Sequence, residues 1–546
     1  MGNAGLGWAA DIEQEETGQE ATCDHTFQPD EWRAEHEIPP AGDGPQECSE
    51  PPLDHSAKCR FHASSQELEW DGLDEDEVFA EYVTEYNGIL DANFNEIHLG
   101  NIDIEGREVK LLSPQISKIR GGDGVFTGDI EFKNAAIDSI NICDFESNGR
   151  INFHTCKIKS SINISGSSFD GCLDFEGSKI DHWTYIFDTE FRENVGLSEV
   201  QSLSDIVAHR CRFLGGIDAN PISRIGSFVL TDCEISEMDC QIFDLEDTLV
   251  QLKDSEIRSG NMRGTGTEDL PRYKPDPDSG PDVLYDLSGA RLGDVELHTA
   301  EKGLENYYFE STDLDNFNLR RHADALKEAN WNLHEFSSKF REYNDLELLS
   351  GGGVGHIDEY PSSNRYQTTA RIRDFESTYI NATRAAELQG DYISASKFFT
   401  RASRARKLIN RRQIAQPNPR HGRSRLIHAV RYAKAVFLQY TCNYGESPLR
   451  TFGWAFLMLT FTTLYYPYSG GVKRASQEII YGRANSTLTE VLGDSLYFSI
   501  STFTTLGYGD FSPITLHTKL IAGGEALAGS VLIALFIFTL SKSMKR

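Results

Sequence analysis

The chain has 546 residues, with 84 Asp and Glu against 52 Lys and Arg, and a formal net charge of −32 at pH 7. At about 100–200 residues per domain, this length predicts about three or four domains. The first 100 residues hold 25 acidic and three basic residues, so the negative charge is concentrated near the N-terminus. Such a surface repels phosphate groups, which argues against the binding of DNA or RNA.

Residues 1–66 are rich in Pro, Glu and Asp and poor in branched apolar residues, a composition typical of an acidic, flexible segment. Its start lacks the basic and apolar pattern of a signal peptide. The segment contains three thiols and an imidazole that together satisfy the tetrahedral geometry of a structural zinc site: Cys23, Cys48, Cys59 and His62. The spacing is irregular and unpaired thiols are the alternative; competing ligands are His25, His36 and His55.

Residues 67–335 are dominated by an internal repeat of eleven residues, clearest from about 128 to 260. Apolar residues fill the first, third and usually the eighth position of each unit, as in Ile151, Phe153 and Ile158. Apolar residues two apart indicate short strands with one buried face. Such strands bury a continuous row of apolar side chains only when the chain coils and the strands stack. The repeat therefore predicts a β-solenoid, a right-handed or pentapeptide-repeat-like β-helix.

A weaker run near 285–320 resembles pentapeptide repeats, and residues 262–284 are expected to form an exposed loop between the two repeat regions. Some solenoids carry polysaccharide lyase sites, but the turns here offer scattered acids without a fixed pair. We therefore expect a scaffold or an assembly surface, and no enzyme.

Residues 336–423 are expected to form a helical hairpin and a basic linker. Two amphipathic stretches within 371–412 are separated by a Gly-Asp pair, similar to a single tetratricopeptide unit. Residues 401–434 contain eleven Lys and Arg and no acidic residue. Such charge collects on the cytoplasmic side of membranes, so we predict an interfacial helix and linker at 424–448.

A pore domain is expected at 449–546, with two membrane spans. Residues 451–468 carry no charge, and residues 520–540 carry one, Glu525. About twenty apolar residues cross a hydrocarbon core about 30 Å thick, so both segments qualify, with a buried soluble helix as the alternative for the first. Basic residues flank the pair, which places the N-terminal region and the C-terminus in the cytoplasm and 469–519 outside.

The external connection contains the strongest chemical signal of the chain: Thr504, Thr505, Leu506, Gly507, Tyr508, Gly509 and Asp510. A potassium ion stripped of water needs rings of oxygen atoms, which the carbonyls of an extended backbone supply. Glycines at alternate positions permit backbone angles that point successive carbonyls inward. Residues 492–503 are long enough for a short helix, whose C-terminal dipole favours a cation.

With the pattern T-x-G-Y-G-D complete, residues 445–546 resemble the two-transmembrane potassium channel family. One residue departs from that family, Leu506, where Val or Ile is more common. The resemblance implies K⁺ as the permeant ion and a homotetramer, since one filter strand per chain cannot close a ring. The filter residues Thr505–Tyr508 would supply oxygen atoms to the ion, and Gly509 and Asp510 would shape the outer mouth.

Two residues of the second span are further candidates. Gly529 follows Gly507 by 22 residues, where this family often has a hinge glycine, although close helix packing is the alternative. Glu525 is an ionisable group within a span and therefore a functional candidate. It would hydrogen-bond the pore helix or be a structural buried acid.

The layout of acidic repeats, hairpin, residues 444–448 and terminal pore resembles haloarchaeal pentapeptide-repeat ion-channel proteins. The excess of acids fits salt-loving archaea, and an acidic mesophilic protein is the alternative. We predict a tetrameric, potassium-selective channel of the cell membrane whose cytoplasmic repeat region regulates gating or assembly. The alternatives are a membrane-anchored β-solenoid scaffold and a non-selective cation channel.

Overall fold

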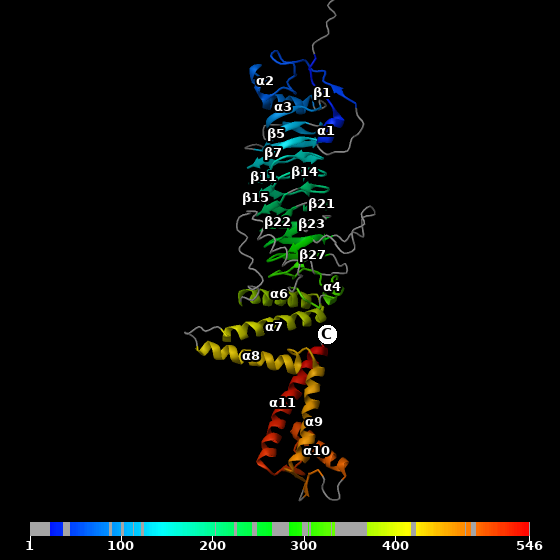
Figure 1. Cartoon of the computed structure of the whole chain (residues 1–546), viewed down its shortest axis with the longest axis vertical. Coiled ribbons are helices and arrows are strands. Elements are labelled where there is room, and N and C mark those ends of the chain that lie inside the picture. Colours follow the sequence, from blue (N-terminus) through cyan, green and yellow to red (C-terminus); the bar gives the residue numbers. More distant parts are fainter. Residues whose placement is uncertain are drawn as a thin grey trace, which may run out of the picture. The chain divides into compact units, whose positions relative to one another are not determined.

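The structure is a computed structural model of the chain (Figure 1). It describes residues 22–35, 44–86, 90–99, 103–112, 114–121, 125–202, 204–222, 226–242, 248–264, 283–297, 304, 307–328, 330–333, 369–415, 422–474, 477–481 and 487–544. The chain divides into two compact units, Met1–Asp286 and Leu287–Arg546, which are described separately.

The first unit begins with a small folded region. Its elements are β1 (Thr26–Phe27), α1 (Pro29–Glu35), β2 (Gln46–Glu47), α2 (Ser65–Trp70) and α3 (Glu75–Thr84). Ser64 and Glu67 form a capping box that starts α2. Phe79 of α3 is buried and its ring meets that of Phe94 edge-on, with centroids 4.9 Å apart. The composition of residues 1–66 predicts a flexible segment. The described residues of this segment instead form short helices and strands that belong to a folded cap.

The solenoid is built from parallel strands that pair with the coil before and the coil after. Ile162 pairs with Ile140 on one side and with Thr184 on the other, within one sheet. Ile151 pairs with Leu173 in a second sheet. Successive eleven-residue units thus alternate between two sheets, and one coil contains 22 residues. The predicted β-solenoid is confirmed, and its handedness stays a prediction.

The strands of the two sheets stack along the unit (Figure 1). In the first unit, one sheet contains β3 (Asn93–His98), β5 (Gln115–Arg120), β7 (Ala136–Cys143), β10 (Lys157–Ile158), β11 (Ile162–Ser165), β14 (Lys179–Ile180), β15 (Thr184–Phe187), β18 (Gln201–Ser202), β19 (Ile206–His209), β22 (Ser227–Thr231), β24 (Thr248–Gln251) and β26 (Val283–Asp286). The other contains β4 (Asp103–Leu112), β6 (Val125–Lys133), β8 (Glu146–Ser147), β9 (Ile151–His154), β12 (Ser168–Phe169), β13 (Leu173–Asp174), β16 (Glu190–Phe191), β17 (Val195–Gly196), β20 (Arg212–Phe213), β21 (Ile217–Ile222), β23 (Glu234–Ile242) and β25 (Glu256–Gly264).

The core of the solenoid is a ladder of apolar side chains at equivalent positions of successive coils. The Phe153 ring lies 5.1 Å from the rings of both Phe132 and Phe175, nearly parallel to each. A second stack contains Phe169, Phe191 and Phe213. Each aromatic pair contributes about 0.5–1.5 kcal/mol beyond the burial of its area. The repeat therefore stabilises every coil through its neighbours.

The turns of the solenoid repeat with the same period. A left-handed residue recurs every eleven positions, with positive φ at Asp144, Thr155, Gly166, Gly177, Asp188, Glu199 and Arg210. In the residues of this set that are not glycine, the left-handed conformation brings Cβ close to the following carbonyl oxygen, which is unfavourable. Hydrogen bonds between coils offset this cost: the Ser178 hydroxyl donates to the Phe153 carbonyl at 2.7 Å and accepts from the Cys156 N–H at 2.9 Å.

The run at 285–320 follows the same spacing as the clearer repeats. It contains β27 (Arg291–Leu297) and β28 (Tyr307–Tyr308), which lie in the second unit. Arg291 bridges to Asp313, 22 residues later, whereas four pentapeptides would make a shorter coil. The spacing therefore does not support the expected pentapeptide repeats. Of the loop expected at 262–284, the described ends belong to β25 and β26, and residues 265–282 lie outside the described residues.

The expected helical hairpin is present in the second unit, after α4 (Ala323–Glu328). It consists of α6 (Thr369–Leu388) and α7 (Tyr392–Ala415), and Gly390 takes φ 68° in the connection. The Asp391 carboxylate accepts a hydrogen bond from the Ser394 N–H at 3.1 Å at the start of α7. The next helix, α8 (Gly422–Cys442), packs against α7 (Figure 1).

Three helices end the chain: α9 (Pro448–Ser469), α10 (Leu488–Phe503) and α11 (Leu516–Met544). α9 and α11 run side by side, and α10 packs on both (Figure 1). A small antiparallel sheet joins their ends: β29 (Val472–Arg474), β30 (Gln477–Glu478) and β31 (Phe511–Pro513). Val472 pairs with Pro513, so the segment after α10 is tied to the end of α9.

Candidate functional site

The predicted filter leaves the end of α10 as an exposed, non-helical segment. α10 ends at Phe503, and residues 504–510 follow without regular structure. Left-handed residues alternate along the segment, with φ of 56° at Thr505, 53° at Gly507 and 82° at Gly509. In a regular strand successive carbonyls point to opposite sides, whereas alternating handedness turns them to the same side. The backbone can therefore present a row of carbonyl oxygen atoms.

The aromatic side chain of the predicted filter, Tyr508, packs on α10. The Tyr508 ring stacks on the Tyr497 ring, with centroids 6.3 Å apart and planes 20° apart. Tyr497 also contacts Phe511, at 5.5 Å, in the strand that follows the filter. Leu506 and Asp510 are exposed in the single chain. α10 thus supports the segment from behind through its aromatic face.

Glu525 lies at the junction of all three terminal helices. Its carboxylate is 1 % exposed and accepts hydrogen bonds from hydroxyl groups on the two other helices. Thr462 and Tyr466 of α9 donate at 2.8 and 2.5 Å, and Ser499 of α10 donates at 2.5 Å. A buried carboxylate without partners is costly, and three donors satisfy its oxygen atoms. The predicted bond to the pore helix is therefore present, together with two bonds to α9.

Gly529 packs directly against the end of α10. A Cβ atom at this position would lie 2.3 Å from the carbonyl oxygen of Phe503, the last residue before the filter segment. Gly523 and Gly524, on the same helix, have no neighbouring atom within 4 Å of such a Cβ. The geometry thus gives Gly529 a packing role at the base of the predicted filter, and its role as a hinge stays a prediction.

A charged contact links the C-terminal end of α11 to α7. The Glu446 carboxylate accepts hydrogen bonds from the Lys542 ammonium and from the Ser396 hydroxyl. The Lys542 Nζ also lies 4.6 Å from the centroid of the Phe399 ring. Only 4 % of the Glu446 side chain is exposed, so the carboxylate is shielded from water, whereas 35 % of the Lys542 side chain is exposed. We call Ser396, Phe399, Glu446 and Lys542 the α7–α11 clamp.

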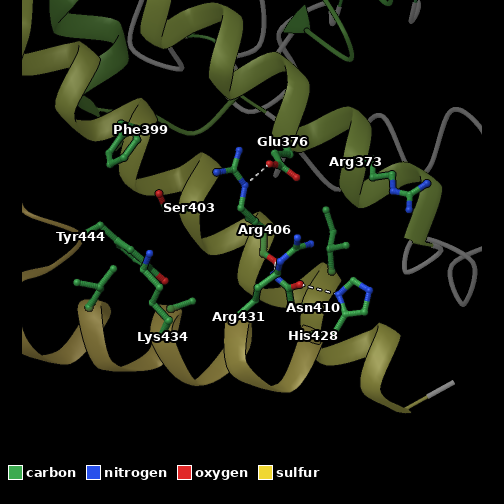
Figure 2. Close-up of a pocket in the computed structure, with 13 residues that line it drawn as sticks. Arg373, Glu376, Phe399, Ser403, Arg406, Asn410, His428, Arg431, Lys434 and Tyr444 are labelled. Carbon is green, nitrogen blue, oxygen red and sulfur yellow. Dashed lines mark hydrogen bonds and ion pairs between the residues drawn. The ribbon is translucent and has the colours of Figure 1, made fainter. Parts of the chain in front are cut away.

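Beside the clamp, residues of α6, α7 and α8 line an open basic pocket of about 650 Å³ (Figure 2). Its charged lining residues are Arg373, Arg406, Arg431, Lys434 and Glu376. Figure 2 shows Arg406 bound to Glu376, at 2.5 Å, and His428 bound to Asn410, at 2.9 Å. Burial and the charges of Arg404 and Arg411 lower the pKa of the nearby Lys407. Three of the basic residues of 401–434 therefore line this pocket where α7 meets α8: Arg406, Arg431 and Lys434.

The four predicted metal ligands lie together in the first unit. The ligand atoms of Cys23, Cys48, Cys59 and His62 all lie within 4.8 Å of one another. Of the competing histidines, His25 pairs with Asp91 at 3.0 Å and His55 pairs with Asp71, while His36 lies outside the described residues. These cysteines and the histidine are remote in sequence from the filter and form a separate candidate site.

Sequence reasoning missed the two partners of Glu525 on α9 and the whole α7–α11 clamp. The sequence did contain a signal for the partners of Glu525. Thr462 and Tyr466 place hydroxyl groups in an otherwise apolar stretch, and a hydroxyl in such surroundings needs a hydrogen-bond partner. For the clamp there was no such signal, because Glu446 and Lys542 are 96 residues apart and only the packing of α9 on α11 brings them together.

Among the described residues, one helix is long and apolar enough to cross a membrane, α11. The other predicted span lies in α9, which has 22 residues and carries no charge over 451–468. Its threonine and tyrosine residues lower its mean hydropathy, so a second span stays a prediction.

Comparison with known proteins gives one match. Residues 453–546 match the Ion channel family, a range that includes α10, the filter segment and α11. No curated protein and no solved structure matches the chain. The C-terminal part of the chain is therefore similar to ion channels, which indicates ion transport rather than catalysis and, together with α11, supports association with a membrane.

Proposed function

We propose that this protein is a potassium-selective channel whose pore is formed by residues 449–546. The observation that carries the proposal is the backbone of 505–509, where left-handed residues alternate directly after the C-terminal end of α10. Rings of carbonyl oxygen atoms replace the hydration shell of K⁺, and the partial negative charge at a helix C-terminus favours a cation there. The match to ion channels over 453–546 supports this assignment.

The proposed pore is a homotetramer. A single chain supplies one row of carbonyl oxygen atoms, and a ring around an ion needs several such rows. The exposed side chains of the filter segment fit this arrangement, since Leu506 and Tyr508 are 59 % and 67 % exposed in one chain. Four copies would bring the segments together around one axis.

The proposed topology has two spans, α9 and α11, with the N-terminal region and the C-terminus in the cytoplasm. α8 would lie along the cytoplasmic surface of the membrane. Its apolar residues Leu426, Ile427 and Val430 are exposed, and its Arg431 and Lys434 line the basic pocket. An amphipathic helix with basic residues binds the interface through its apolar face and attracts anionic lipid headgroups.

The proposed route of regulation is the α7–α11 clamp. It joins the end of α11, the proposed inner helix, to the helical hairpin. A movement of the hairpin would therefore bias the position of α11. Coupling between two sites is commonly worth about 1–3 kcal/mol, or about 5–150-fold in an equilibrium.

Flux measurements with the full chain in liposomes test the proposed function. A potassium gradient should drive rubidium uptake that barium blocks, and the reversal potential should shift when sodium replaces potassium. Gly507→Ala should abolish the flux, because φ of 53° strains any other residue, while Gly493→Ala should keep it. Gly493 offers the same chemical change in α10, with no atom within 4 Å of the added Cβ.

Two outcomes would overturn this proposal. A folded, oligomeric protein without barium-sensitive flux would be the membrane-anchored scaffold. Equal permeability to sodium and potassium would make the protein a non-selective cation channel.

Single-channel recording tests the clamp separately. Lys542→Met removes the ammonium and should change the open probability at least about fivefold, at the lower end of known couplings. Lys519→Met, on the exposed first turn of the same helix, is the matched control and should leave the open probability unchanged. Equal open probabilities of the Lys542→Met and Lys519→Met variants would show that the clamp takes no part in gating.

The resemblance in layout to haloarchaeal channel proteins remains part of the proposal. The net charge of −32 on each chain supports it, because a surface of this kind repels itself in dilute buffer and is screened in brine. At molar salt the screening length is about 3 Å, so steering of cations by these acids would nearly vanish.

A further inference from the structure

The first unit holds four side chains with the spacing of a tetrahedral metal site. The Nδ1 atom of His62 lies 3.2 Å from the Cys59 Sγ and 3.5 Å from the Cys23 Sγ. The Sγ atoms of Cys48 and Cys59 are 3.8 Å apart. Zinc bonds of about 2.3 Å to sulfur and about 2.0–2.1 Å to nitrogen place tetrahedral ligand atoms about 3.5–3.8 Å apart. The three measured distances lie close to that range.

Local structure explains how distant ligands converge. β1 and β2 pair antiparallel, with Thr26 opposite Glu47, and the pairing continues beyond both strands. The Cys48 N–H donates to the His25 carbonyl at 3.1 Å and the Cys23 N–H donates to the Glu50 carbonyl at 2.8 Å, which brings the two cysteines near each other. The two remaining ligands share one turn, in which the His62 N–H donates to the Cys59 carbonyl at 3.0 Å. That turn leads directly into α2, whose capping box holds it in place.

Hydrogen bonds around the cluster prepare its atoms for a cation. The Nε2 of His62 donates to the Leu90 carbonyl at 2.9 Å, which leaves Nδ1 without a proton and facing the thiols. The Cys59 N–H donates to the Cys23 Sγ at 3.1 Å, as suits a thiolate. His25 stacks on His62 at 4.0 Å but pairs with Asp91, so it stands outside the ligand set.

We infer that Cys23, Cys48, Cys59 and His62 bind one zinc ion, which fastens the N-terminal segment to the first coil of the solenoid. Three thiolates and one imidazole form a closed structural set, with no position left open for catalysis. A disulfide does not fit the same atoms, because its sulfur atoms would be about 2.05 Å apart.

The zinc would complete a cap over the open edge of the solenoid. His62 binds the Leu90 carbonyl, and the carbonyl of its neighbour Phe61 accepts from the N–H of Asn93, the first residue of β3, at 2.7 Å. The terminal coil of a solenoid needs such a cover, because its unpaired strand edge and apolar core are otherwise exposed. The metal thereby takes the place of a larger core in this acidic segment.

Metal analysis of the full chain, purified without chelators from cells grown with added zinc, tests the inference. We expect about one zinc ion per chain, the ratio that one closed ligand set implies. Cys59→Ser should remove most of the zinc. Cys48→Ser, at a half-buried position, should lower the zinc content without the risk of misfolding that a fully buried position carries. Cys172→Ser, at a half-buried position in the solenoid, is the matched control and should keep the metal.

A second measurement does not depend on any variant. Cobalt added to the metal-free full chain should give the intense visible bands of tetrahedral cobalt and the charge-transfer bands of cobalt bound to thiolates, and zinc should abolish both. Absence of metal in the wild type together with absence of these bands would overturn the inference. So would iron in place of zinc, or unchanged zinc in both ligand variants. These results are independent of whether the protein conducts potassium.

Discussion

The packing of Gly529 on the end of α10 leads to a sharp prediction. In Gly529→Ala, the new Cβ would lie 2.3 Å from the Phe503 carbonyl oxygen, whereas Cβ atoms are essentially never found closer than 3.0 Å to another heavy atom. The neighbouring atom is backbone, so no side chain can turn aside to relieve the clash. α11 must move away from α10, the helix that precedes the proposed filter.

The magnitude follows from a matched pair of substitutions. Overpacking of a close contact costs about 1–3 kcal/mol. Replacement of glycine by alanine within a helix gains up to about 1 kcal/mol, and this gain is shared by Gly523→Ala, where nothing lies within 4 Å of the Cβ. The difference between the two variants should therefore be the overpacking cost alone, about 1–3 kcal/mol for each chain.

Thermal stability of the purified oligomer, followed by size-exclusion chromatography after heating, measures this difference. The Gly529→Ala variant should lose its oligomer at a lower temperature than the Gly523→Ala variant, by about 2–4 °C per kcal/mol if it behaves as a domain of 150–250 residues. A hinge role predicts another pattern, with unchanged stability and a reduced open probability. Equal stability of the two variants would refute the packing argument.

Three further predictions address other parts of the fold. Glu525→Ala should lower the recovery of the oligomer, because the buried Tyr466 hydroxyl loses its acceptor at about 1–3 kcal/mol in each chain, whereas the Thr462 and Ser499 hydroxyls still bond each other; a normal elution profile would contradict this. Phe153→Ala should lower the free energy of unfolding of the solenoid by about 3–5 kcal/mol in urea, and a loss below about 1 kcal/mol would mean that the aromatic stack is not structural. Stability should also rise with KCl concentration, since salt screens the charge of −32, and a flat or falling unfolding midpoint would count against self-repulsion.

The eleven-residue repeat shows which features of the solenoid sequence periodicity can predict and which it cannot. The eleven-residue spacing and the apolar pairs two apart predicted a solenoid, and the buried faces lie where the pattern placed them, as at Ile151 and Phe153. The period alone does not tell whether one unit or two complete a coil, because both choices bury the same positions. Only the pairing of Ile140 with Ile162 decides this, and it also explains why the run near 291–313 keeps the longer spacing.

The residue types of the four candidate zinc ligands allowed the set to be predicted from the sequence, but the way in which the chain brings them together was not predictable. Their spacing of 25 and 11 residues matches no regular motif outside the pair at Cys59 and His62. The convergence depends on β1 and β2, each only two residues long, and so short a pairing leaves no periodic signal in the sequence. Long-range closure of this kind is decided by hydrogen bonds that form only in the folded chain.

The proposed filter and the side chains that support it differ in how far the sequence predicts them. The proposed ion binding at 505–509 depends on the backbone conformation of that segment. Glycines at 507 and 509 favour the left-handed conformation locally, so a short motif suffices to predict this backbone conformation. The support depends on side chains from three helices, such as Glu525 with Thr462 and Ser499, and no local pattern encodes which of them meet. A substitution in the support should therefore act on the stability of the pore before it acts on ion selectivity, whereas a substitution such as Gly507→Ala should act on conduction first.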